Sequence, residues 1–366
     1  MPTLNFTAED WARIDRDYAA WWTGELERPL VYLAATDPYP GPKPLGYLSN
    51  YPLDMPAAAV VDRVAPALAA TRYYADAYPY FWLNFGPGIV AGFLGSVVHS
   101  VSEPSETVWF SPHGPTDLAE LTLAYDPDNV WWRRVQEVAR AFTVRYCRQL
   151  QIGHTDLGGN LDILASLRDT SQLLYDVIEQ PTEVVRLAGA LTRLWLRYYD
   201  ELDAIIRPAC GGTSTWVPIR STGKTYMLQS DFAYMISPRM FERFVLPDLE
   251  ACCAHLDHGF YHLDGKGQIP HLDLLLAIPR LRGIQWIPGD GQPSPDQWLD
   301  LLKRIRDAGK LCQVFVSPEG ARRIVSTLGG KGFYLVIQHN GHDFRDPDAA
   351  QAFLKVLARD DARTRA

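Results

Sequence analysis

The chain has 366 residues, of which 47% are hydrophobic and 21% are charged, and its formal net charge is −8. This composition is ordinary for a globular protein, and the length suits one large α/β barrel. The acidic balance, without Lys- or Arg-rich runs, predicts no nucleic-acid partner, and no apolar run approaches the roughly 20 residues of a membrane span.

The five cysteines and the first residues of the chain bear on its compartment. The cysteines are odd in number and form no CxxC pattern, which favours buried free thiols over a disulfide framework. The N-terminal residues include acidic side chains and do not have the pattern of a signal peptide. Together these observations predict a cytoplasmic protein.

The first 80 residues are predicted to form an N-terminal extension that packs on the rest of the chain. A helix is expected over residues 11–22, and an extended run follows at residues 29–35. A loop rich in proline and glycine comes next. Residues 57–77 are rich in alanine and predict a second helix, which Pro66 would kink.

The middle of the chain alternates strand-like and helical runs. Residues 131–150 and 182–206 carry apolar side chains at helical spacing, and Pro181 suits the start of the second of these helices. Residues 237–259 open with a Ser-Pro pair that is typical of a helix start, and Gly259 is expected to end this helix.

The last third of the chain predicts four strand–helix units in succession. The expected strands cover residues 260–263, 283–287, 311–316 and 333–338, and the helices after them cover residues 269–280, 295–309, 317–330 and 347–359. This alternation is typical of a parallel sheet with crossover helices. No glycine-rich phosphate loop follows a strand, so no nucleotide cofactor is expected. The sequence therefore predicts a (β/α)8 TIM barrel over residues 81–366.

His262 and Asp264 stand at the end of a predicted strand, where such barrels carry their chemistry. Alternate residues of a strand point the same way, so the two side chains could be metal ligands, with His339 or His342 as a third. A hydrogen-bonded His–Asp pair that acts as acid and base is an alternative. A structural turn is another.

Further candidates are scattered along the other predicted strand ends. Asp231 could act as an acid–base group or anchor a ligand, or it could cap the next helix. Arg168 could pair with a substrate carboxylate or phosphate, or be an exposed helix residue. Trp286 could stack on a ligand or fill the core, whereas His271 is expected to be solvated or to support the site indirectly. The remaining candidates for substrate binding are Asn160, Trp216, Gln229, Gln285 and Gln313, and other polar residues near strand ends are Asp156, Asp162, Asp290 and Gln338.

Three segments of the C-terminal half carry a family resemblance. They are SDFAYMISPRMFERFVLPDL, FYHLDGKGQIPHLDLLLAIPRLRGIQWIPGDG and the finish in which AGK, a strand, SPEGARRIV and a last strand follow one another. In this order they resemble the uroporphyrinogen decarboxylase-like superfamily, which includes uroporphyrinogen decarboxylase and the corrinoid- or thiol-linked methyltransferases. The resemblance covers residues 155–358, with a looser match at residues 85–88. It implies a (β/α)8 barrel with the active site at the carboxyl ends of the strands.

The resemblance is incomplete at the site. Uroporphyrinogen decarboxylase opens with an arginine-rich motif that grips substrate carboxylates, and this N-terminus has none. The zinc methyltransferases of the family carry His-x-Cys at one strand end and a later cysteine, where this chain has Asp264 and His339. Thiolate ligands give zinc an electron-rich site that activates a thiol, whereas a His/Asp set favours activating water or polarising an oxygen.

The leading interpretation is a divergent member of this superfamily that performs group transfer, as a methyltransferase acting on a small molecule. His262, Asp264 and Asp231 would be catalytic, and His262, Asp264 and His339 would hold zinc, although a metal-free site stays open. The resemblance implies a corrinoid protein as a partner and a homodimer. The alternative is a lyase, such as a decarboxylase, or a hydrolase that uses Asp231 and Asp264 as an acid–base pair on a carboxylate or carbohydrate. A binding protein without chemistry is a third reading.

Overall fold

A mostly parallel sheet forms the centre of the computed structural model, which describes residues 4–100, 107–114, 117–340 and 343–365. Its strands are β1 (Leu30–Thr36), β2 (Thr71–Ala75), β7 (Thr225–Leu228), β8 (His258–Asp264), β9 (Leu281–Ile287), β10 (Leu311–Val316) and β11 (Phe333–Ile337). Their order in the sheet is β2-β1-β11-β10-β9-β8-β7, and every neighbouring pair is parallel except β1 and β2. Two short pairs complete the strands: β3 (Tyr80–Trp82) with β6 (Gln151–Gly153), which are parallel, and β4 (Val97–His99) with β5 (Trp109–Ser111), which are antiparallel.

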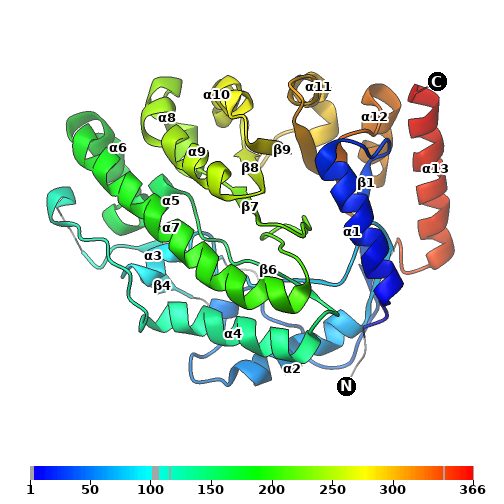
Figure 1. Ribbon diagram of the computed structural model, residues 1–366, viewed down its shortest axis with the longest axis horizontal. Coiled ribbons are helices and arrows are strands. Elements are labelled where there is room, and N and C mark those ends of the chain that lie inside the picture. Colours follow the sequence, from blue (N-terminus) through cyan, green and yellow to red (C-terminus); the bar gives the residue numbers. More distant parts are fainter. Residues whose placement is uncertain (1–3, 101–106, 115–116, 341–342, 366) are drawn as a thin grey trace.

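Helices surround these strands. They are α1 (Ala8–Thr23), α2 (Ala57–Ala69), α3 (Val90–Phe93), α4 (Val130–Tyr146), α5 (Asn160–Arg168), α6 (Thr170–Glu179), α7 (Pro181–Cys210), α8 (Pro238–Phe244), α9 (Leu246–His255), α10 (Leu272–Ala277), α11 (Leu299–Asp307), α12 (Pro318–Leu328) and α13 (Pro347–Arg365). Short 3-10 helices are η1 (Leu48–Asn50), η2 (Leu118–Glu120), η3 (Asp231–Met235), η4 (Lys266–His271) and η5 (Pro295–Gln297). Figure 1 shows α8, α10, α11, α12 and α13 in an arc along one side of the strands, with α2 and α4 on the opposite side.

The four predicted C-terminal units are confirmed. Each is a strand followed by a helix: β8 by α10, β9 by α11, β10 by α12 and β11 by α13. The prediction of an α/β fold with a parallel sheet is therefore correct. Within the described residues, the hydrogen-bonded ladders form one sheet and two separate pairs rather than a closed ring, so barrel closure stays a prediction.

Two predicted helices have different bounds in the structure. The helix expected over residues 57–77 ends at Ala69, because Thr71–Ala75 pairs antiparallel with β1, and this pairing satisfies the backbone of both strands. The helix expected over residues 237–259 is divided into α8 and α9, with Pro247 in the first turn of α9. Gly259 lies in β8, where a Cβ would come 3.0 Å from the Cys253 sulfur, so it permits close helix–strand packing.

The predicted N-terminal extension includes part of the sheet. β1 pairs in parallel with β11, in the register of Val31 with Leu335. Residues 30–36 are therefore continuous with the strands of the C-terminal half. Helix α1 precedes them and begins with a capping box, in which Thr7 and Asp10 each accept a hydrogen bond from the other's backbone N–H.

Helix α1 covers the amino ends of the parallel strands with aromatic side chains. Trp21 is 1% exposed and stacks on Phe260, the third residue of β8, at a centroid distance of 6.0 Å. The Tyr18 and Tyr334 hydroxyls are 3.1 Å apart, and the Trp22 indole N–H donates to the Arg220 carbonyl over 2.9 Å. This packing fills one end of the sheet and leaves the carboxyl ends of the strands for a site.

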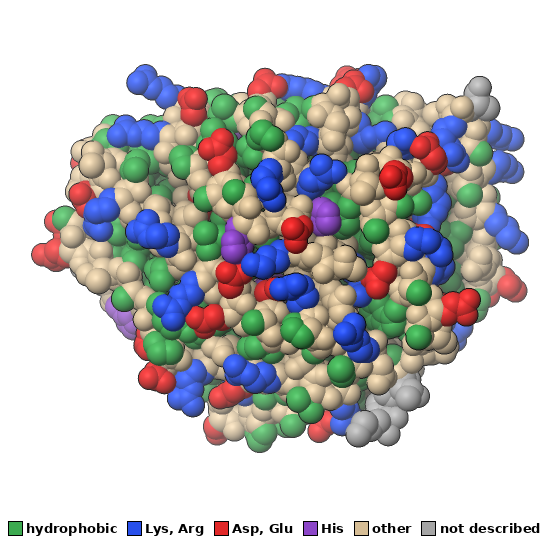
Figure 2. Space-filling model, in the orientation of Figure 1, with side chains coloured by type: hydrophobic (Ala, Val, Ile, Leu, Met, Phe, Trp, Pro, Cys, Tyr) green, Lys and Arg blue, Asp and Glu red, His purple; other side chains and the backbone are tan. Residues whose placement is uncertain are grey.

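The surface has mixed charge on the face seen in Figure 2, where Lys and Arg side chains alternate with Asp and Glu side chains. No large region of one sign is visible on that face. Among the described helices, none is both long enough and apolar enough to cross a bilayer.

Replacing Trp21 with alanine should lower the free energy of unfolding by about 3–5 kcal/mol, because it leaves a cavity between α1 and the strands. Urea unfolding followed by circular dichroism would measure the change. Trp109→Ala is the matched control, since Trp109 is 48% exposed on β5, and it should cost less than about 1 kcal/mol. Equal losses in the two variants would contradict the role of α1 as a packed cover.

Candidate metal and catalytic site

Three ionisable residues meet at the carboxyl ends of β7 and β8. His262 and Asp264 are alternate residues of β8, and Asp231 begins η3, shortly after β7 ends. One potential ligand atom from each lies within 4.8 Å of the others, and His262 Nε2 is 3.8 Å from an Asp264 carboxylate oxygen. The structure thus brings together the three residues that the sequence proposed as catalytic.

The third metal ligand expected from sequence does not join this group. His339 follows β11, three strands from β8 in the sheet, and its Nε2 donates to the Ala34 carbonyl over 2.9 Å. His342 lies outside the described residues. In the described part of the chain, the third member of the group is Asp231, where the sequence had predicted a second histidine as the third metal ligand.

A chain of hydrogen bonds across three strands orients His262. Gln285 on β9 lies beside His262 in the sheet register, and Gln313 on β10 lies beside Gln285. The His262 Nδ1–H donates to the Gln285 amide oxygen, and the Gln285 amide nitrogen donates to the Gln313 amide oxygen. Because an amide oxygen accepts only, this arrangement places a hydrogen on Nδ1 and turns Nε2 towards the carboxylates.

The charges in this group favour a protonated histidine when no cation is bound. Burial disfavours the imidazolium form of His262, but the hydrogen bond to Asp264 and the charge of Asp231 outweigh it and raise its pKa. The protein around Asp231 removes part of its hydration and raises its pKa, and the Asp264 charge adds to this although His262 opposes it. A metal ion bound here would therefore replace a proton on His262.

Two more carboxyl groups lie behind the site, one buried and one partly buried. Asp156 follows β6, is 5% exposed, accepts the Gly158 N–H at 2.9 Å and lies 3.5 Å from the Gln229 amide nitrogen. Burial raises its pKa to about 7, and the Asp231 charge contributes to the rise. Asp162 on α5 is likewise raised to a pKa of about 7, chiefly by burial. Both groups can hold a proton near neutral pH.

Asp162 also fixes the start of η3. Its carboxylate accepts the backbone N–H groups of Asp231 at 3.1 Å and Phe232 at 2.8 Å. His271, expected to be solvated or to act indirectly, is buried and donates from Nε2 to the Ala233 carbonyl at 2.8 Å. Both contacts hold η3 in place. The expectation that His271 is solvated is therefore wrong, and its hydrogen bond supports the site indirectly through η3.

Two glycines make room for the ring of Tyr234. A Cβ on Gly265 would lie 2.8 Å from this ring, and a Cβ on Gly267 would lie 2.7 Å from it. Gly265 also has a φ of +78°, which favours glycine. The ring therefore packs directly on the backbone after β8, and this contact holds η3 with Asp231 beside His262 and Asp264.

Four further sequence candidates lie near the site. Trp216 presents its ring at 82° to the His262 ring, with centroids 4.9 Å apart. Gln285 and Gln313 form the chain of hydrogen bonds, and Gln229 lies beside Asp156. Trp216 and Gln285 thus contact His262 directly, whereas Gln313 and Gln229 contact its neighbours.

Three others are engaged elsewhere. Asn160 begins α5 and donates from its side-chain amide to the Phe244 carbonyl at 3.0 Å. Arg168, at the other end of α5, forms an ion pair with Asp176 at 2.7 Å. Trp286 is fully buried and packs edge-on against Trp298, on the opposite face of β9 from Gln285.

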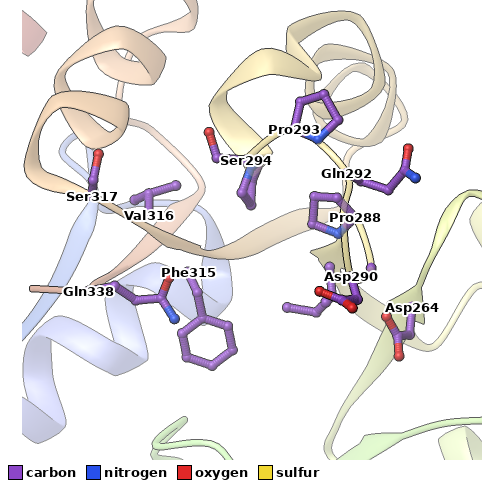
Figure 3. Close-up of a pocket in the computed structure, with 13 residues that line it drawn as sticks. Asp264, Pro288, Asp290, Gln292, Pro293, Ser294, Phe315, Val316, Ser317 and Gln338 are labelled. Carbon is purple, nitrogen blue, oxygen red and sulfur yellow. The ribbon is translucent and has the colours of Figure 1, made fainter.

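A pocket of about 520 Å³ adjoins Asp264. It lies over the carboxyl ends of β9, β10 and β11 and the loop after β9, and Asp290, Phe315 and Gln338 are among its lining residues. Figure 3 shows Asp264 and Asp290 on one side of this space and Phe315 and Gln338 on the other. A substrate held in the pocket would reach the group of Asp231, His262 and Asp264 through Asp264.

Comparison with known proteins supports the fold. The sequence matches no protein-family model, and no curated protein matches it. The structure is similar to a methyltransferase from Methanosarcina mazei, with a TM-score of 0.60 and 10% identity over 94% of this chain and 98% of that chain. A B12-independent methionine synthase from Shewanella sp. W3-18-1 aligns over 75% of each chain at 11% identity, with a TM-score of only 0.37. The first likeness shows that the chain shares the fold of that methyltransferase.

Replacing Asp156 with asparagine should stabilise the protein at pH 8 and not at pH 4. The Asp156 carboxyl group has a pKa of about 7 in the folded protein and 3.8 as its ordinary value. The folded state therefore binds the proton more tightly than the unfolded state, and the free energy of unfolding falls as the pH rises between these two values. The gain at pH 8 should be about 2–4 kcal/mol, measured by urea unfolding.

Asp273→Asn is the matched control for this pH dependence. The Asp273 side chain is 80% exposed, so the variant should change stability by less than about 0.5 kcal/mol at both pH values. An Asp156→Asn variant that is destabilised equally at pH 4 and pH 8 would show that the pKa of the Asp156 carboxyl group is not raised in the folded protein.

Proposed function

We propose that the chain is a methyltransferase that acts on a small molecule, and that Asp231, His262 and Asp264 hold a catalytic zinc ion. The observation that carries this proposal is the meeting of these three side chains at the carboxyl edge of the sheet. The fold shared with a methyltransferase supports it. The order of β1, β3, β6, β7, β8, β9, β10 and β11, with helices between them, also supports a (β/α)8 barrel of the uroporphyrinogen decarboxylase-like superfamily.

The donor set fits zinc. One imidazole nitrogen and two carboxylate oxygens provide three protein ligands, which leaves a fourth position open, as catalytic zinc sites require. The Gln285 amide oxygen binds the other ring nitrogen of His262, and such a partner commonly orients a metal-binding histidine. Zinc bound here would act as a Lewis acid on an oxygen or lower the pKa of a bound water.

The remaining site residues would position the reactants and handle protons. Asp156 has a pKa of about 7 and would supply or store a proton behind the zinc ligands. The family resemblance makes a methylated corrinoid protein a candidate methyl donor.

A lyase or hydrolase is the second candidate. It is favoured by the absence of a cysteine from the group of ligands in the described residues, because thiolates are what tune zinc for thiol methylation. In this case Asp231 and Asp264 would serve as acid and base on a small polar substrate, such as a carboxylate or a carbohydrate.

The purified protein should bind one zinc ion per chain, and His262→Ala should abolish this binding, because it removes the only nitrogen ligand. His339→Ala is the control and should retain zinc, since His339 lies outside the group. Metal content after dialysis would be measured by mass spectrometry. Equal zinc in wild type and His262→Ala would contradict the site.

Zinc affinity should rise with pH, because the metal must displace the proton that Asp264 and Asp231 favour on His262. Gln285→Leu should weaken zinc binding by about 10–100-fold through the loss of the orienting hydrogen bond. Competition with a chromogenic chelator between pH 6 and pH 8 would measure both effects. A pH-independent affinity would show that His262 is not a ligand.

Methyl transfer can be separated from the alternative by a direct assay. The zinc-loaded protein should demethylate methylcobalamin in the presence of small thiol, alcohol or amine acceptors, with an absorbance change that Asp264→Asn removes. Release of carbon dioxide or sugar from candidate substrates, with the same dependence on Asp264 and no demethylation, would establish the second candidate instead.

A further inference from the structure

Another pocket, of about 280 Å³, lies between α1, the start of β1 and the second half of α13. Figure 1 shows α13 beside α1. We call it the arginine pocket, because Arg13, Arg28 and Arg365 line it. None of its lining residues belongs to the candidate zinc group, and it lies towards the amino ends of the strands rather than their carboxyl ends. It is therefore a separate cavity.

One wall of the arginine pocket is apolar. Leu354, Leu357 and Ala358 share one face of α13, since they are three and four residues apart, and Val31 of β1 adds to the lining. A cavity of about 150 Å³ is enough to hold benzene. The arginine pocket thus has room for a ring-sized apolar body together with a polar group.

The carboxylates of the arginine pocket already have partners. Asp76 is fully buried and accepts two hydrogen bonds from Arg28, at 2.7 and 2.8 Å, and one from the Val31 N–H at 2.9 Å. Asp361 accepts the Gly330 N–H at 2.6 Å and pairs with Arg365 at 3.1 Å. Three arginines and two aspartates leave one positive charge in the lining, although the whole chain is acidic.

Arg13 carries this unbalanced charge. In the part of the chain that the structure describes, its side chain donates from Nη1 to the Ala75 carbonyl at 2.8 Å and forms no ion pair. Ala75 has a φ of +52°, and its carbonyl holds the guanidinium beside the pocket. Asp10, one turn earlier on α1, accepts instead from Thr7. A guanidinium stays charged at any physiological pH and offers five N–H donors, a match for a carboxylate.

We propose that the arginine pocket binds a small monocarboxylate with an apolar body of about the size of one ring. Arg13 would pair with the carboxylate, and Leu354, Leu357 and Ala358 would contact the apolar body. The bound acid would join α1 to α13 and so hold the cover that α1 forms over the amino ends of the strands. This site does not depend on the proposed function.

Three probes of nearly the same shape test the proposal. Cyclohexanecarboxylate is an anion, cyclohexylmethanol is neutral and cyclohexylmethylamine is a cation at pH 7. Isothermal titration calorimetry should show the carboxylate binding at least about tenfold more tightly than the alcohol, and no binding of the amine. Acetate, which lacks the ring, should bind at least about tenfold more weakly than cyclohexanecarboxylate. An alcohol, an amine or acetate that binds as tightly as the ring carboxylate would overturn the proposal.

Arg13→Gln tests the charged contact. It should weaken cyclohexanecarboxylate at least about tenfold and leave the binding of the alcohol unchanged, which damage to the fold would not do. Arg16→Gln is the matched control on the same helix, because the Arg16 side chain is 70% exposed and does not line the pocket. If Arg13→Gln binds the carboxylate as the wild type does, the proposal is wrong.

Ala358→Trp tests the location by filling the pocket from an exposed position of α13. It should abolish binding of cyclohexanecarboxylate, together with the rise in unfolding temperature that the ligand gives the wild type. Ala352→Trp is the control, since Ala352 is exposed on the same helix and does not line the pocket. Circular dichroism checks the fold of each variant. Undiminished binding in Ala358→Trp would refute the site, whatever the protein does with zinc or methyl groups.

Discussion

The aromatic packing of α1 is the constraint on which the site depends. A parallel sheet has two chemically different edges, and Tyr18, Trp21 and Trp22 fill the edge at which the strands begin. His262 follows Phe260 by two residues along β8 and so lies on the same face of the strand, nearer its carboxyl end. His262, Gln285 and Gln313 are neighbours in register on β8, β9 and β10, and the hydrogen bonds between them follow from that register rather than from their spacing in sequence.

The position of Asp231 depends on a different set of contacts. Asp162 binds the first N–H groups of η3, His271 binds the Ala233 carbonyl, and the Tyr234 ring packs on two glycines. These partners come from α5, η4 and the turn after β8, so three segments hold one short helix in place. Holding it there has a cost, because the partial burial of Asp162 removes hydration from its carboxylate and raises its pKa. Such strain is common where a fold positions reactive groups.

The sequence predicted the regular part of the fold and named the three residues that the structure brings together at the candidate site. The four C-terminal units were visible because each strand and helix has its own periodicity, and His262 and Asp264 followed from the alternation along one strand. The third metal ligand was expected at His339, whereas Asp231, expected as a catalytic residue, is the one that lies in the group. Its place there depends on how η3 folds back after β7. Similarly, residues 71–75 carry no local signal that would end the predicted helix before them. They form a strand because they pair with β1. Tertiary contacts decided both cases.

The donor set and the pocket together constrain the chemistry. Two carboxylates and one neutral imidazole would cancel the charge of a bound zinc ion, so the field felt by a substrate would come from the groups outside that set. These are Asp290 in the pocket wall and the partly ionised Asp156 and Asp162. All three are acidic, so the field beside the site would be negative whether or not the metal is bound. Zinc held by these hard donors would favour chemistry at an oxygen or nitrogen of the substrate over activation of an anionic thiolate, which this field would repel.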